Sequence, residues 1–548
     1  ALDTGRDLDL YLVHAQEARR KLDRLFGFEL SPVLWKKLSN KKLSAGRVQS
    51  PGLRLVVDRE RERLKFVSST FWDAKATLST EKGETFVAKL DSLDGRRVAG
   101  SKDFDSTSGE FLKKDKGEVP VLLDAATAQD VAVRLKDASW QVAEVIEKPV
   151  TSRPAPPFIT STLQQEGNRK LHLSAKQTMT IAQKLYENGF ITYMRTDSPT
   201  LSQDGIAAAR QSVQELYGDE YLSPAPRQYS AKSASAQEAH EAIRPAGEYF
   251  VRPEKTGLHG KDRALYELIW KRTLASQMAD ARKSSTSVRI DAVAGDMSAR
   301  FSATGTHIVF PGFIRVYVEG NDDPEAALED KETFLPVLSQ DQVLQAKDIE
   351  AVSHETKPPA RFTEASLVQQ LEKMGIGRPS TYATIIDRLL GKAYVDKDGN
   401  ALVPTFVGFG VVQLLERHFA RYVDYSFTSG MEEDLDGIAA GRIDEKMKEI
   451  TAADVKKIEL PQLKSDSSIF IGPYGAYTVV DDGEGGTRYL SLPRMWTPAS
   501  VTDEALQEFI GQEKKMKEGG ADAGMGVDPA TGKSVYLISG RNGDFWQL

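Results

Sequence analysis

The sequence predicts a multi-domain α+β protein, and three observations support this fold class. The chain has 548 residues, which is more than one hydrophobic core supports. Segments with apolar residues at helical spacing alternate with segments of strict apolar–polar alternation, which is typical of strands. Proline-rich segments at 153–158 and 357–362 separate these regions and indicate joints between domains.

The composition limits the classes of function. The chain has no cysteine, which excludes disulfides, thiol nucleophiles and cysteine-based zinc sites. Its seven histidines form no HExxH or HxH cluster, so a metal ion would need carboxylate ligands. No apolar run approaches the ~20 residues that span a bilayer, and residues 1–13 lack the pattern of a signal peptide. We expect a cytoplasmic protein that does not enter a membrane.

A basic region lies inside this chain of net charge −7. Residues 19–65 contain 14 basic and 5 acidic side chains, which is the pattern of a candidate phosphate-binding face. A solvated helix surface is the alternative, and the alternating signs of residues 58–63 favour it for that stretch. The earlier part of the region remains a candidate for nucleic-acid contact.

Two helices and then several strands are expected in the first part of the chain. Residues 15–28 carry an apolar stripe that includes Leu22 and Phe26, and Gly27 is expected to end this helix. A loop at 39–47 leads into a second helix. Alternation predicts strands within 71–79, 84–93 and 139–147. We therefore expect a helical segment at 1–65 and a strand segment at 66–150.

A helical insert then interrupts the strand pattern. Helices are predicted at 162–170, 175–187 and 203–217, with Ser174 and Ser202 as N-caps of the second and third. Strands resume within 286–319, in the sequences TSVRIDAV, DMSARFSA and IRVYVE. The expected domains are a helical insert at 151–285 and a second strand segment at 286–354.

The remaining residues predict a second helical segment and a small β repeat. Within 355–460, a helix capped by Thr363, a glycine-rich turn, a helix from Pro379 and a hairpin at KDGN have the outline of a winged helix. That shape often binds DNA, but it also serves as scaffold. GxxGx-aromatic sequences at 472–477 and 540–545 predict repeated β units within 466–548.

The segment GFITYMRTDSPTLS holds a candidate nucleophile. Residues 191–196 are predicted to form a short strand, so Tyr193 and Arg195 share a face and Met194 points the other way. A phenol has a solution pKa of ~10 and ionises little at neutral pH. An adjacent guanidinium favours the phenoxide and neutralises charge in a phosphoryl-transfer transition state. A structural tyrosine on a strand is the alternative.

A second candidate is QEAHEAIRP at 237–245, which predicts a helix ended by Pro245. At helical spacing, Gln237, His240 and Arg244 lie on one face. An imidazole that exchanges protons beside a permanent cation suits phosphate contact or protonation of a leaving group. A histidine satisfied at a domain interface is the alternative.

The segment GIGRPSTYATII has the features of an anion site. Arg378, Ser380 and Thr381 surround an expected helix start at Pro379, where free N–H groups attract anions. Simple N-terminal capping of the helix is the alternative.

The segment LSAGRVQS has a similar character. Small residues such as Ser44 let a backbone approach closely, Arg47 supplies charge, and Gln49 can contact a base edge. Neither GxxxxGKS nor GxGxxG occurs in the chain, so neither an ATP site nor a dinucleotide site is expected.

Taken together, these segments resemble the bacterial type IA DNA topoisomerase family. FITYMRTDS, EAHEAIRP and GIGRPSTY form a highly specific set. AQEARRKLDR, LSAGRVQS, the segment from RPAPPF to NRKL and the GPYGAY repeat also match, and the match is collinear over nearly the whole chain. The resemblance implies a toroidal body with winged-helix-like helical domains, a β arch and small C-terminal β repeats.

The resemblance also implies an activity. Tyr193 would break one DNA strand and hold its 5′ phosphate as a phosphotyrosine, another strand would pass, and the break would be resealed without ATP. Negatively supercoiled DNA would be relaxed in this way. Arg195 would position the scissile phosphate and His240 would lie near it. The single strand would be held by Arg20, Arg24, Phe28, Ser44, Arg47, Gln49, Arg244, Arg378, Ser380 and Thr381.

Three departures from the family pattern change what is expected of this chain. Family members begin with a TOPRIM domain whose acidic residues hold Mg²⁺, and nothing here matches it. Asp7 and Asp9 lie in the segment that follows that domain, so no metal ligands are expected in this chain. The family usually has more residues near Asp444 and Glu445. Many relatives end in four-cysteine zinc ribbons, whereas no zinc is expected here.

These departures leave an alternative function open. Without the TOPRIM domain, the chain would be a single-stranded DNA-binding fragment that cannot complete cleavage and religation. RNA is also an open substrate, because attack by Tyr193 does not depend on a 2′-hydroxyl. The protein is expected to be a monomer.

Overall fold

The computed structural model describes residues 8–112, 119–230, 241–322 and 334–442. From there on it describes the stretches 469–472, 475–481, 487–493, 496–497, 501–518, 526–527, 534–540 and 543–547. Across these ranges, every helix is too short or too polar to cross a bilayer.

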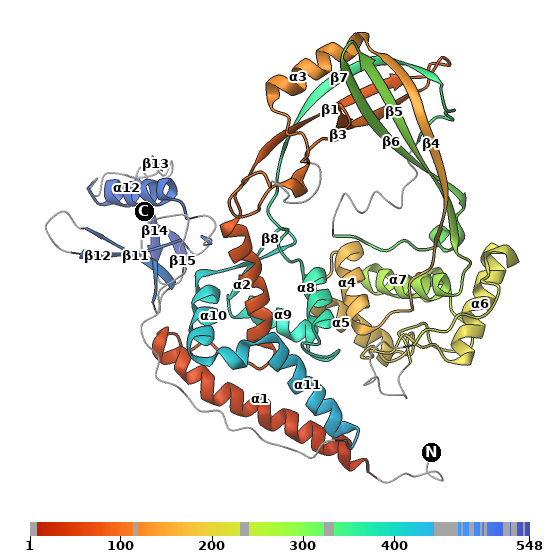
Figure 1. The fold of residues 1–548 in the computed structure, drawn as a ribbon. Helices are drawn as coiled ribbons and strands as arrows, with labels where there is room; N and C mark the ends of the chain where they lie inside the picture. Colours follow the sequence, from red (N-terminus) through yellow and green to blue (C-terminus); the bar gives the residue numbers. More distant parts are fainter. Residues whose placement is uncertain are drawn as a thin grey trace.

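The molecule has a ring-like outline (Figure 1). A long, curved β sheet stands above two helical regions, and its strands descend to both of them. The ring is closed below, where α4 (Thr160–Leu171) packs against α8 (Glu364–Lys373) and α5 (Ala175–Glu187) packs against α9 (Tyr382–Gly391). This arrangement agrees with the predicted toroidal α+β body.

One helical region combines the two ends of the main body. It consists of α1 (Leu10–Lys37), α2 (Gln49–Lys65), α8, α9, α10 (Phe406–Phe419) and α11 (Tyr425–Ala439), with the hairpin of β8 (Val395–Asp398) and β9 (Ala401–Pro404). A single core joins Leu34 and Leu53 to Leu367 and Phe409. The predicted order of helix, turn, helix and hairpin is confirmed, and Thr363 caps α8 as predicted.

Helix α1 is longer than the sequence predicts. It continues through Gly27 and Pro32 to Lys37, so the predicted end at Gly27 was wrong. Beyond the glycine, Leu30 and Leu34 are fully buried. Their burial outweighs the ~1 kcal/mol that a glycine costs inside a helix, and also the loss of one backbone hydrogen bond at the proline.

The β sheet has seven strands in the order β1-β7-β4-β5-β6-β2-β3. All its neighbouring strands pair antiparallel. Helix α3 (Ala125–Arg134) packs on β1 and β7, and Trp140 and Phe301 lie in the buried core between the layers. The strands are β1 (Thr70–Ser79), β2 (Thr85–Leu93), β3 (Arg96–Arg97), β4 (Ser139–Ser152), β5 (Ala281–Ala294), β6 (Met297–Phe310) and β7 (Val343–Glu355).

One predicted strand is absent from this sheet. Residues 314–319 were expected to be a strand, but a short 3-10 helix occupies Gly312–Arg315 and the backbone that follows is irregular. Gly312 has a positive φ of 51° and its Cα lies against the carbonyls of Ala279 and Asp280, so the chain turns sharply after β6. Tyr317 is thereby buried in the core of the helical insert.

The helical insert consists of α4, α5, α6 (Gln203–Tyr217) and α7 (Gly260–Ser276). Ser174 accepts a hydrogen bond from Gln177 N and Ser202 accepts one from Gly205 N, which confirms both predicted N-caps. Buried aromatic rings, including Phe158, form the core of the insert.

The C-terminal part contains the predicted β repeats. In the first copy Gly472 pairs with Gly475 across a hairpin, and in the second copy Gly540 pairs with Gly543 in the same way. The elements are β10 (Ile469–Gly472), β11 (Gly475–Asp481), β12 (Thr487–Ser491), α12 (Asp503–Glu518), β13 (Gly526–Val527), β14 (Ser534–Gly540) and β15 (Gly543–Gln547).

Candidate active site and strand-binding face

The segment around Tyr193 is irregular, with bends at Thr192 and Met194, and is not a strand. The predicted strand at 191–196 was wrong, because the segment makes one isolated bridge, Ile191 to Pro245, and no ladder. The predicted alternation is nevertheless present. Tyr193 and Arg195 are exposed, whereas Met194 and Thr196 are buried. The two candidate residues therefore share the solvent side of a segment whose other side is packed.

Thr160, at the start of α4, holds this segment from one side. Its hydroxyl lies 2.8 Å from the carbonyl oxygen of Met194 and 3.0 Å from that of Thr196, and it accepts a hydrogen bond from Thr196 N at 2.8 Å. Thr160 N donates to Thr196 O at 3.0 Å. Thr160 is fully buried, so these bonds are shielded from water.

Residues 242–246 hold the same segment from the other side. Thr192 N donates to Arg244 O at 2.9 Å, and the Thr192 hydroxyl donates to Ala242 O at 2.7 Å. Ala246 N donates to Phe190 O at 2.9 Å. The described residues 241–245 are extended, so the predicted helix is wrong for them. These backbone groups bond across to the Tyr193 segment instead of along a helix.

His240, the predicted neighbour of the scissile phosphate, lies outside the described residues, as does Gln237. Arg244 is described and is 7% exposed. Its guanidinium donates to Glu241 Oε1 at 2.6 Å, to Pro245 O at 2.8 Å and to Ser202 Oγ at 3.3 Å. Arg244 therefore fixes the loop beside Tyr193 from inside, and its predicted contact with DNA stays untested.

The Tyr193 ring is 44% exposed and packs edge-on against Tyr186 of α5, with ring centroids 5.2 Å apart. The neighbouring Arg195 has no polar partner among the residues that the structure describes. An exposed phenol and an unpaired guanidinium on the same side of a fixed segment can both reach a phosphate that approaches from solvent.

The insert meets the other helical region at the start of α5. Ala175 N donates to the buried carboxylate of Glu364 at 2.7 Å, and Lys176 forms an ion pair with Asp387 at 3.0 Å. The start of α5 thus contacts both α8 and α9.

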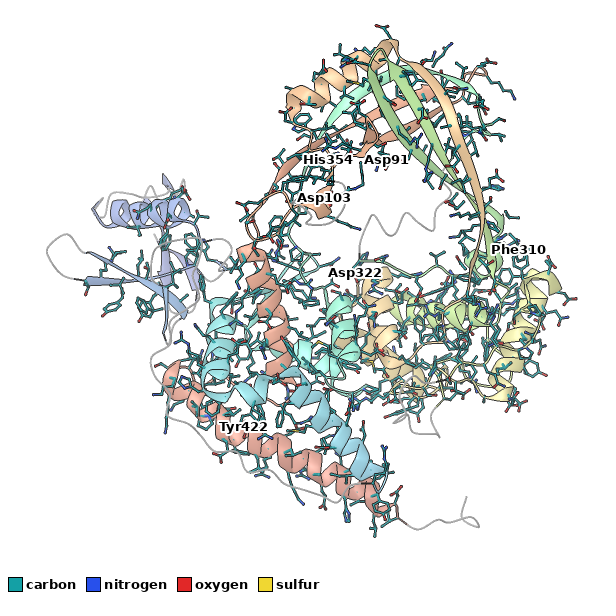
Figure 2. The ribbon with its side chains drawn as sticks, in the orientation of Figure 1. Asp91, Asp103, Phe310, Asp322, His354 and Tyr422 are labelled. Carbon is teal, nitrogen blue, oxygen red and sulfur yellow. The ribbon has the colours of Figure 1, made fainter. Side chains whose placement is uncertain are left out.

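Asp322 forms a further contact between these two regions. Its carboxylate accepts a hydrogen bond from the Thr363 hydroxyl at 3.0 Å and forms an ion pair with Arg169 of α4 at 2.7 Å. Figure 2 labels Asp322 beside this junction. The junction between the insert and the other helical region therefore includes polar contacts and ion pairs.

Three of the predicted strand-binding residues form an exposed stripe on α1. Arg20, Arg24 and Phe28 are spaced four apart, and all three are exposed. The Arg24 guanidinium lies over the Phe28 ring, 5.2 Å from its centroid. Phe28 itself is 65% exposed. The stripe offers two cations and one stacking surface to a ligand.

The residues of the LSAGRVQS segment are mostly buried. Gln49 is 3% exposed and donates to Ser44 O at 3.2 Å. Ser44 is partly buried, and its backbone exchanges hydrogen bonds with the Tyr394 hydroxyl. Arg47 is 3% exposed. In this state of the molecule these side chains organise the loop before α2 and are not open to a ligand.

The turn before α9 differs from the prediction. The helix starts at Tyr382 and not at Pro379, and the Thr381 hydroxyl closes the turn by accepting from Arg378 N at 2.8 Å. Ser380 is exposed, whereas Arg378 is partly buried and pairs with Asp436 of α11 at 2.5 Å. The predicted anion site is thus partly occupied by a carboxylate of the protein itself.

Sequence reasoning missed the acidic partner at the centre of this face. Glu432 of α11 is completely buried, and three guanidinium groups lie within ion-pair distance of its carboxylate. They belong to Arg47 at 2.5 Å, Arg19 at 3.1 Å and Arg378 at 3.9 Å. The sequence contains no signal that separates this glutamate from Glu433 beside it.

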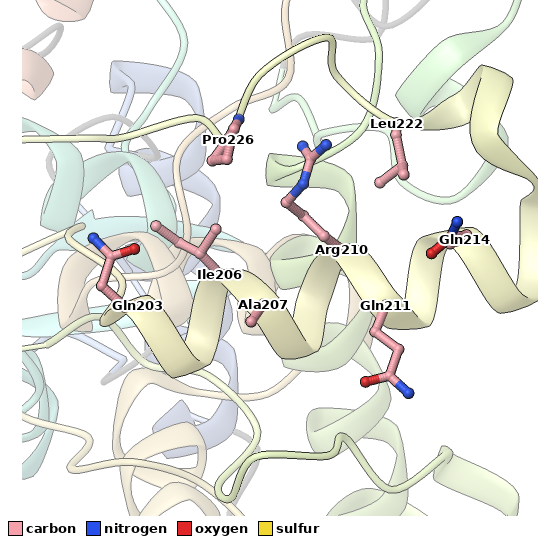
Figure 3. Close-up of a pocket in the computed structure, with 8 residues that line it drawn as sticks. All are labelled: Gln203, Ile206, Ala207, Arg210, Gln211, Gln214, Leu222 and Pro226. Atoms are coloured by element: carbon pink, nitrogen blue, oxygen red, sulfur yellow. The ribbon is translucent and has the colours of Figure 1, made fainter.

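Two further features of the described residues bear on chemistry. Among the described residues, no group of three or more acidic or histidine side chains converges as metal ligands would. A pocket of about 470 Å³ lies on α6, lined among others by Ile206, Arg210 and Leu222 (Figure 3). Arg210 donates to Ser223 there. None of the predicted site residues lines this pocket.

Comparison with known proteins gives the family. The family model for DNA topoisomerase matches residues 7–448. This match covers most of the chain, including Tyr193, Arg195 and the α1 stripe. The chain belongs to the bacterial type IA DNA topoisomerase family.

Individual relatives agree with this result. The DNA topoisomerase 1 of Synechococcus elongatus is 48% identical over 568 aligned residues, which cover 100% of this chain and 62% of the relative. That of Streptomyces coelicolor is 45% identical over 588 residues, with 100% and 61% covered. The chain thus spans about three fifths of the length of these relatives. The fold is also similar to that of full-length topoisomerase I from Thermotoga maritima, with a TM-score of 0.66, 32% identity, and coverage of 90% of this chain and 78% of that one.

Proposed function

We propose that this chain is the strand-binding and strand-cleaving body of a type IA DNA topoisomerase, with Tyr193 as the nucleophile. The placement of Tyr193 carries the proposal. Its phenol is exposed on a segment that Thr160 fixes from one side and residues 242–246 fix from the other. A nucleophile held in this way is positioned before the substrate arrives.

The chemical step is a transfer of one phosphodiester bond. The Tyr193 oxygen loses its proton and attacks the phosphorus of the DNA backbone, and the 3′ oxygen of the preceding nucleotide leaves and takes up a proton. The products are a 5′ phosphotyrosine and a free 3′ hydroxyl. Because the ester keeps the energy of the broken bond, the reverse attack reseals the strand without ATP.

Arg195 supports this step electrostatically. Its guanidinium shares the solvent side with Tyr193 and has no described polar partner to neutralise it. A free cation there stabilises the phenoxide and the charge on the phosphoryl oxygens in the transition state. We propose His240 as the proton-transfer group near the leaving oxygen, from the sequence motif alone.

The α1 stripe is the proposed contact for the single strand. Phe28 supplies a face on which a base can stack, and Arg20 and Arg24 supply cations for the phosphates on either side. Seven further residues are proposed to shape the groove for the strand: Ser44, Ser380, Thr381, Arg47, Gln49, Arg244 and Arg378. The last four would do so from buried or ion-paired positions.

The activity of the whole protein is proposed by analogy with its relatives. It would relax negatively supercoiled DNA as a monomer in the bacterial cytoplasm and would use Mg²⁺. The described residues do not provide a carboxylate cluster that fits this ion, so no catalytic step is assigned to it here. The proposed parts are the helical segments 1–65 and 355–460, the arch 66–150 and 286–354, the insert 151–285 and the repeats 466–548.

A labelling experiment tests the nucleophile. The chain is incubated with a single-stranded oligonucleotide labelled at its 5′ end or, separately, at its 3′ end, with and without Mg²⁺, and products are resolved on denaturing gels. We expect the 3′ label to become attached to protein in the wild type and not in Tyr193→Phe. Tyr186→Phe is the matched control, because Tyr186 is a neighbouring exposed tyrosine, 42% exposed.

The outcomes separate the alternatives. Loss of the adduct in Tyr186→Phe, or attachment of the 5′ label, would contradict the proposed chemistry. A shift on native gels with no covalent product would favour the second candidate, a strand-binding fragment. The exposed α1 stripe is the observation that favours that candidate, because it serves binding without cleavage.

A further inference from the structure

The buried carboxylate of Glu432 has no role in the proposed cleavage step, yet it lies where three separate chain segments meet. Arg19 comes from α1, Arg47 from the loop before α2 and Arg378 from the turn before α9. A fully buried charge is costly unless it is paired. These ion pairs are therefore the reason that the three guanidinium groups stay together.

The charges around Glu432 favour its ionised form. Burial alone would raise the pKa of its carboxyl, but the charges of Arg47, Arg19 and Arg378 hold this pKa below its usual range. Asp23 pairs with Arg47 at 2.9 Å. Asp23, which is 52% exposed, thus ties Arg47 to the surface, and Asp436 pairs in the same way with Arg378 at 2.5 Å.

The three arginines are held unequally. Arg47 is buried and donates a hydrogen bond to Glu432 Oε1. The side chains of Arg19 and Arg378 are 23% and 21% exposed, and Oε2 of Glu432, which faces them, lacks a well-aligned hydrogen bond. Arg19 is therefore attracted by charge and keeps donors that can turn to a ligand, whereas the Arg378 guanidinium also donates to Asp436 at 2.5 Å and to Gly377 O at 2.7 Å.

We infer that Glu432 is a positioning residue for strand binding, which holds Arg19, Arg47 and Arg378 together beside the α1 stripe and fixes Arg19 as the guanidinium that meets the ligand. Arg19 is adjacent to Arg20 on α1, so Arg19 and the stripe share a helix. The ligand recognised by Arg19 and the stripe is the phosphate backbone of a single strand. The inference rests on the proposed strand binding and adds the residue that organises it.

Two simpler views predict different behaviour. If Glu432 only offset positive charge, its neutralisation would strengthen binding, because one more net positive charge attracts the polyanion. If Glu432 only stabilised the fold, its neutralisation would lower stability and leave the affinity of the folded protein unchanged. A positioning role predicts weaker binding despite the gained positive charge, because the donors lose their fixed geometry.

The test measures binding of a fluorescein-labelled single-stranded oligonucleotide by anisotropy, at several salt concentrations and well below the melting temperature of each variant. The variants of the full chain are Glu432→Gln, Arg19→Ala and their combination. Glu60→Gln is the matched control, because Glu60 is 1% exposed and pairs with Arg361 at 2.7 Å in the same helical region.

We expect Glu432→Gln to weaken binding roughly five- to tenfold, which is the size of coupling found within one ion-pair network. Glu60→Gln should bind as the wild type does. The double variant should bind no more weakly than Arg19→Ala alone, since Glu432 acts on the strand through Arg19. Wild-type or tighter binding by Glu432→Gln, or an equal loss in Glu60→Gln, would overturn the inference.

A second variant decides the matter if Glu432→Gln does not fold. Glu432→Asp keeps the charge but withdraws the carboxylate by one methylene. Binding at least twofold weaker than in Glu60→Asp supports the inference, and equal binding overturns it. If the wild-type chain itself does not bind the oligonucleotide, the proposed strand binding is wrong. If the wild type binds and the Glu432 variants bind equally well, only the inference is wrong.

Discussion

The hydroxyl of Thr160 lies 2.8 Å from the carbonyl oxygen of Met194, the residue that follows Tyr193. This contact joins the first residue of α4 to the segment that carries the proposed nucleophile. The side chain of Tyr193 is exposed while its backbone stays fixed, because the backbone on both sides of Tyr193 is hydrogen-bonded to buried groups.

Thr160→Val removes the hydroxyl and keeps the shape of the side chain. We expect cleavage of a labelled single strand to fall roughly ten- to hundredfold, because small misplacements of reacting groups have effects of this size. Strand binding should be unchanged. Thr273→Val is the control, since Thr273 is also fully buried and its hydroxyl donates to a backbone carbonyl, 2.8 Å from Ile269 O. Equal cleavage by both variants would exclude the role of Thr160.

Arg195→Ala should weaken cleavage far more than strand binding. The guanidinium lies on the side of Tyr193 and stabilises charge that develops during phosphoryl transfer, so its loss affects the transition state more than the bound strand. Cleavage rates and dissociation constants are measured on the same oligonucleotide. Losses of equal size in the two quantities would rule out the proposed role.

Phe28→Ala should lower affinity for single strands with little effect on folding. A stacked base contributes ~1–3 kcal/mol, so the dissociation constant should rise about five- to 150-fold. Because the ring is 65% exposed, the melting temperature should barely change. Phe334→Ala is the control, since that ring is 72% exposed on another part of the molecule. An unchanged dissociation constant for Phe28→Ala would show that no base stacks there.

Stability should depend on pH through Glu432. The folded-state pKa of this carboxyl is lowered from an ordinary value of 4.5, so the folded protein binds fewer protons than the unfolded chain. The stabilisation is complete above that ordinary value and is lost as the pH falls through the folded-state pKa. Urea unfolding at pH 6 and pH 4 should show a smaller acid-induced loss in Glu432→Gln than in the wild type. An identical loss in both would contradict the lowered pKa.

Gly205→Ala should disturb the loop beside Tyr193 from behind. A Cβ at this position would lie 2.7 Å from Arg244 Nε, so the guanidinium must move away from Glu241. We expect a loss of about 1–3 kcal/mol in the free energy of unfolding, as overpacking usually produces. Gly511→Ala is the control, because a Cβ there meets no atom within 4 Å. A Gly205→Ala protein as stable as the wild type would show that Arg244 is free to move.

The sequence by itself determined the local features of this protein. The N-caps Ser174, Ser202 and Thr363 were predictable because a side-chain oxygen satisfies N–H groups only a few residues away. The common orientation of Tyr193 and Arg195 was also predictable, since alternation depends on backbone geometry and not on a partner strand. The resemblance to the type IA family and the paired glycines of the β repeats were visible in the same way.

Only the tertiary structure decided which polar residues face solvent. Arg20 and Arg47 look alike in the sequence, yet Arg20 is exposed whereas Arg47 is buried against Glu432. Helix α1 continues through Pro32 because distant residues bury its apolar side. The partner of a buried charge lies hundreds of residues away, as Arg47 and Glu432 do, and no local pattern encodes it. Burial and ion pairing depend on which distant segments pack together. These segments come together only in the folded, ring-shaped molecule.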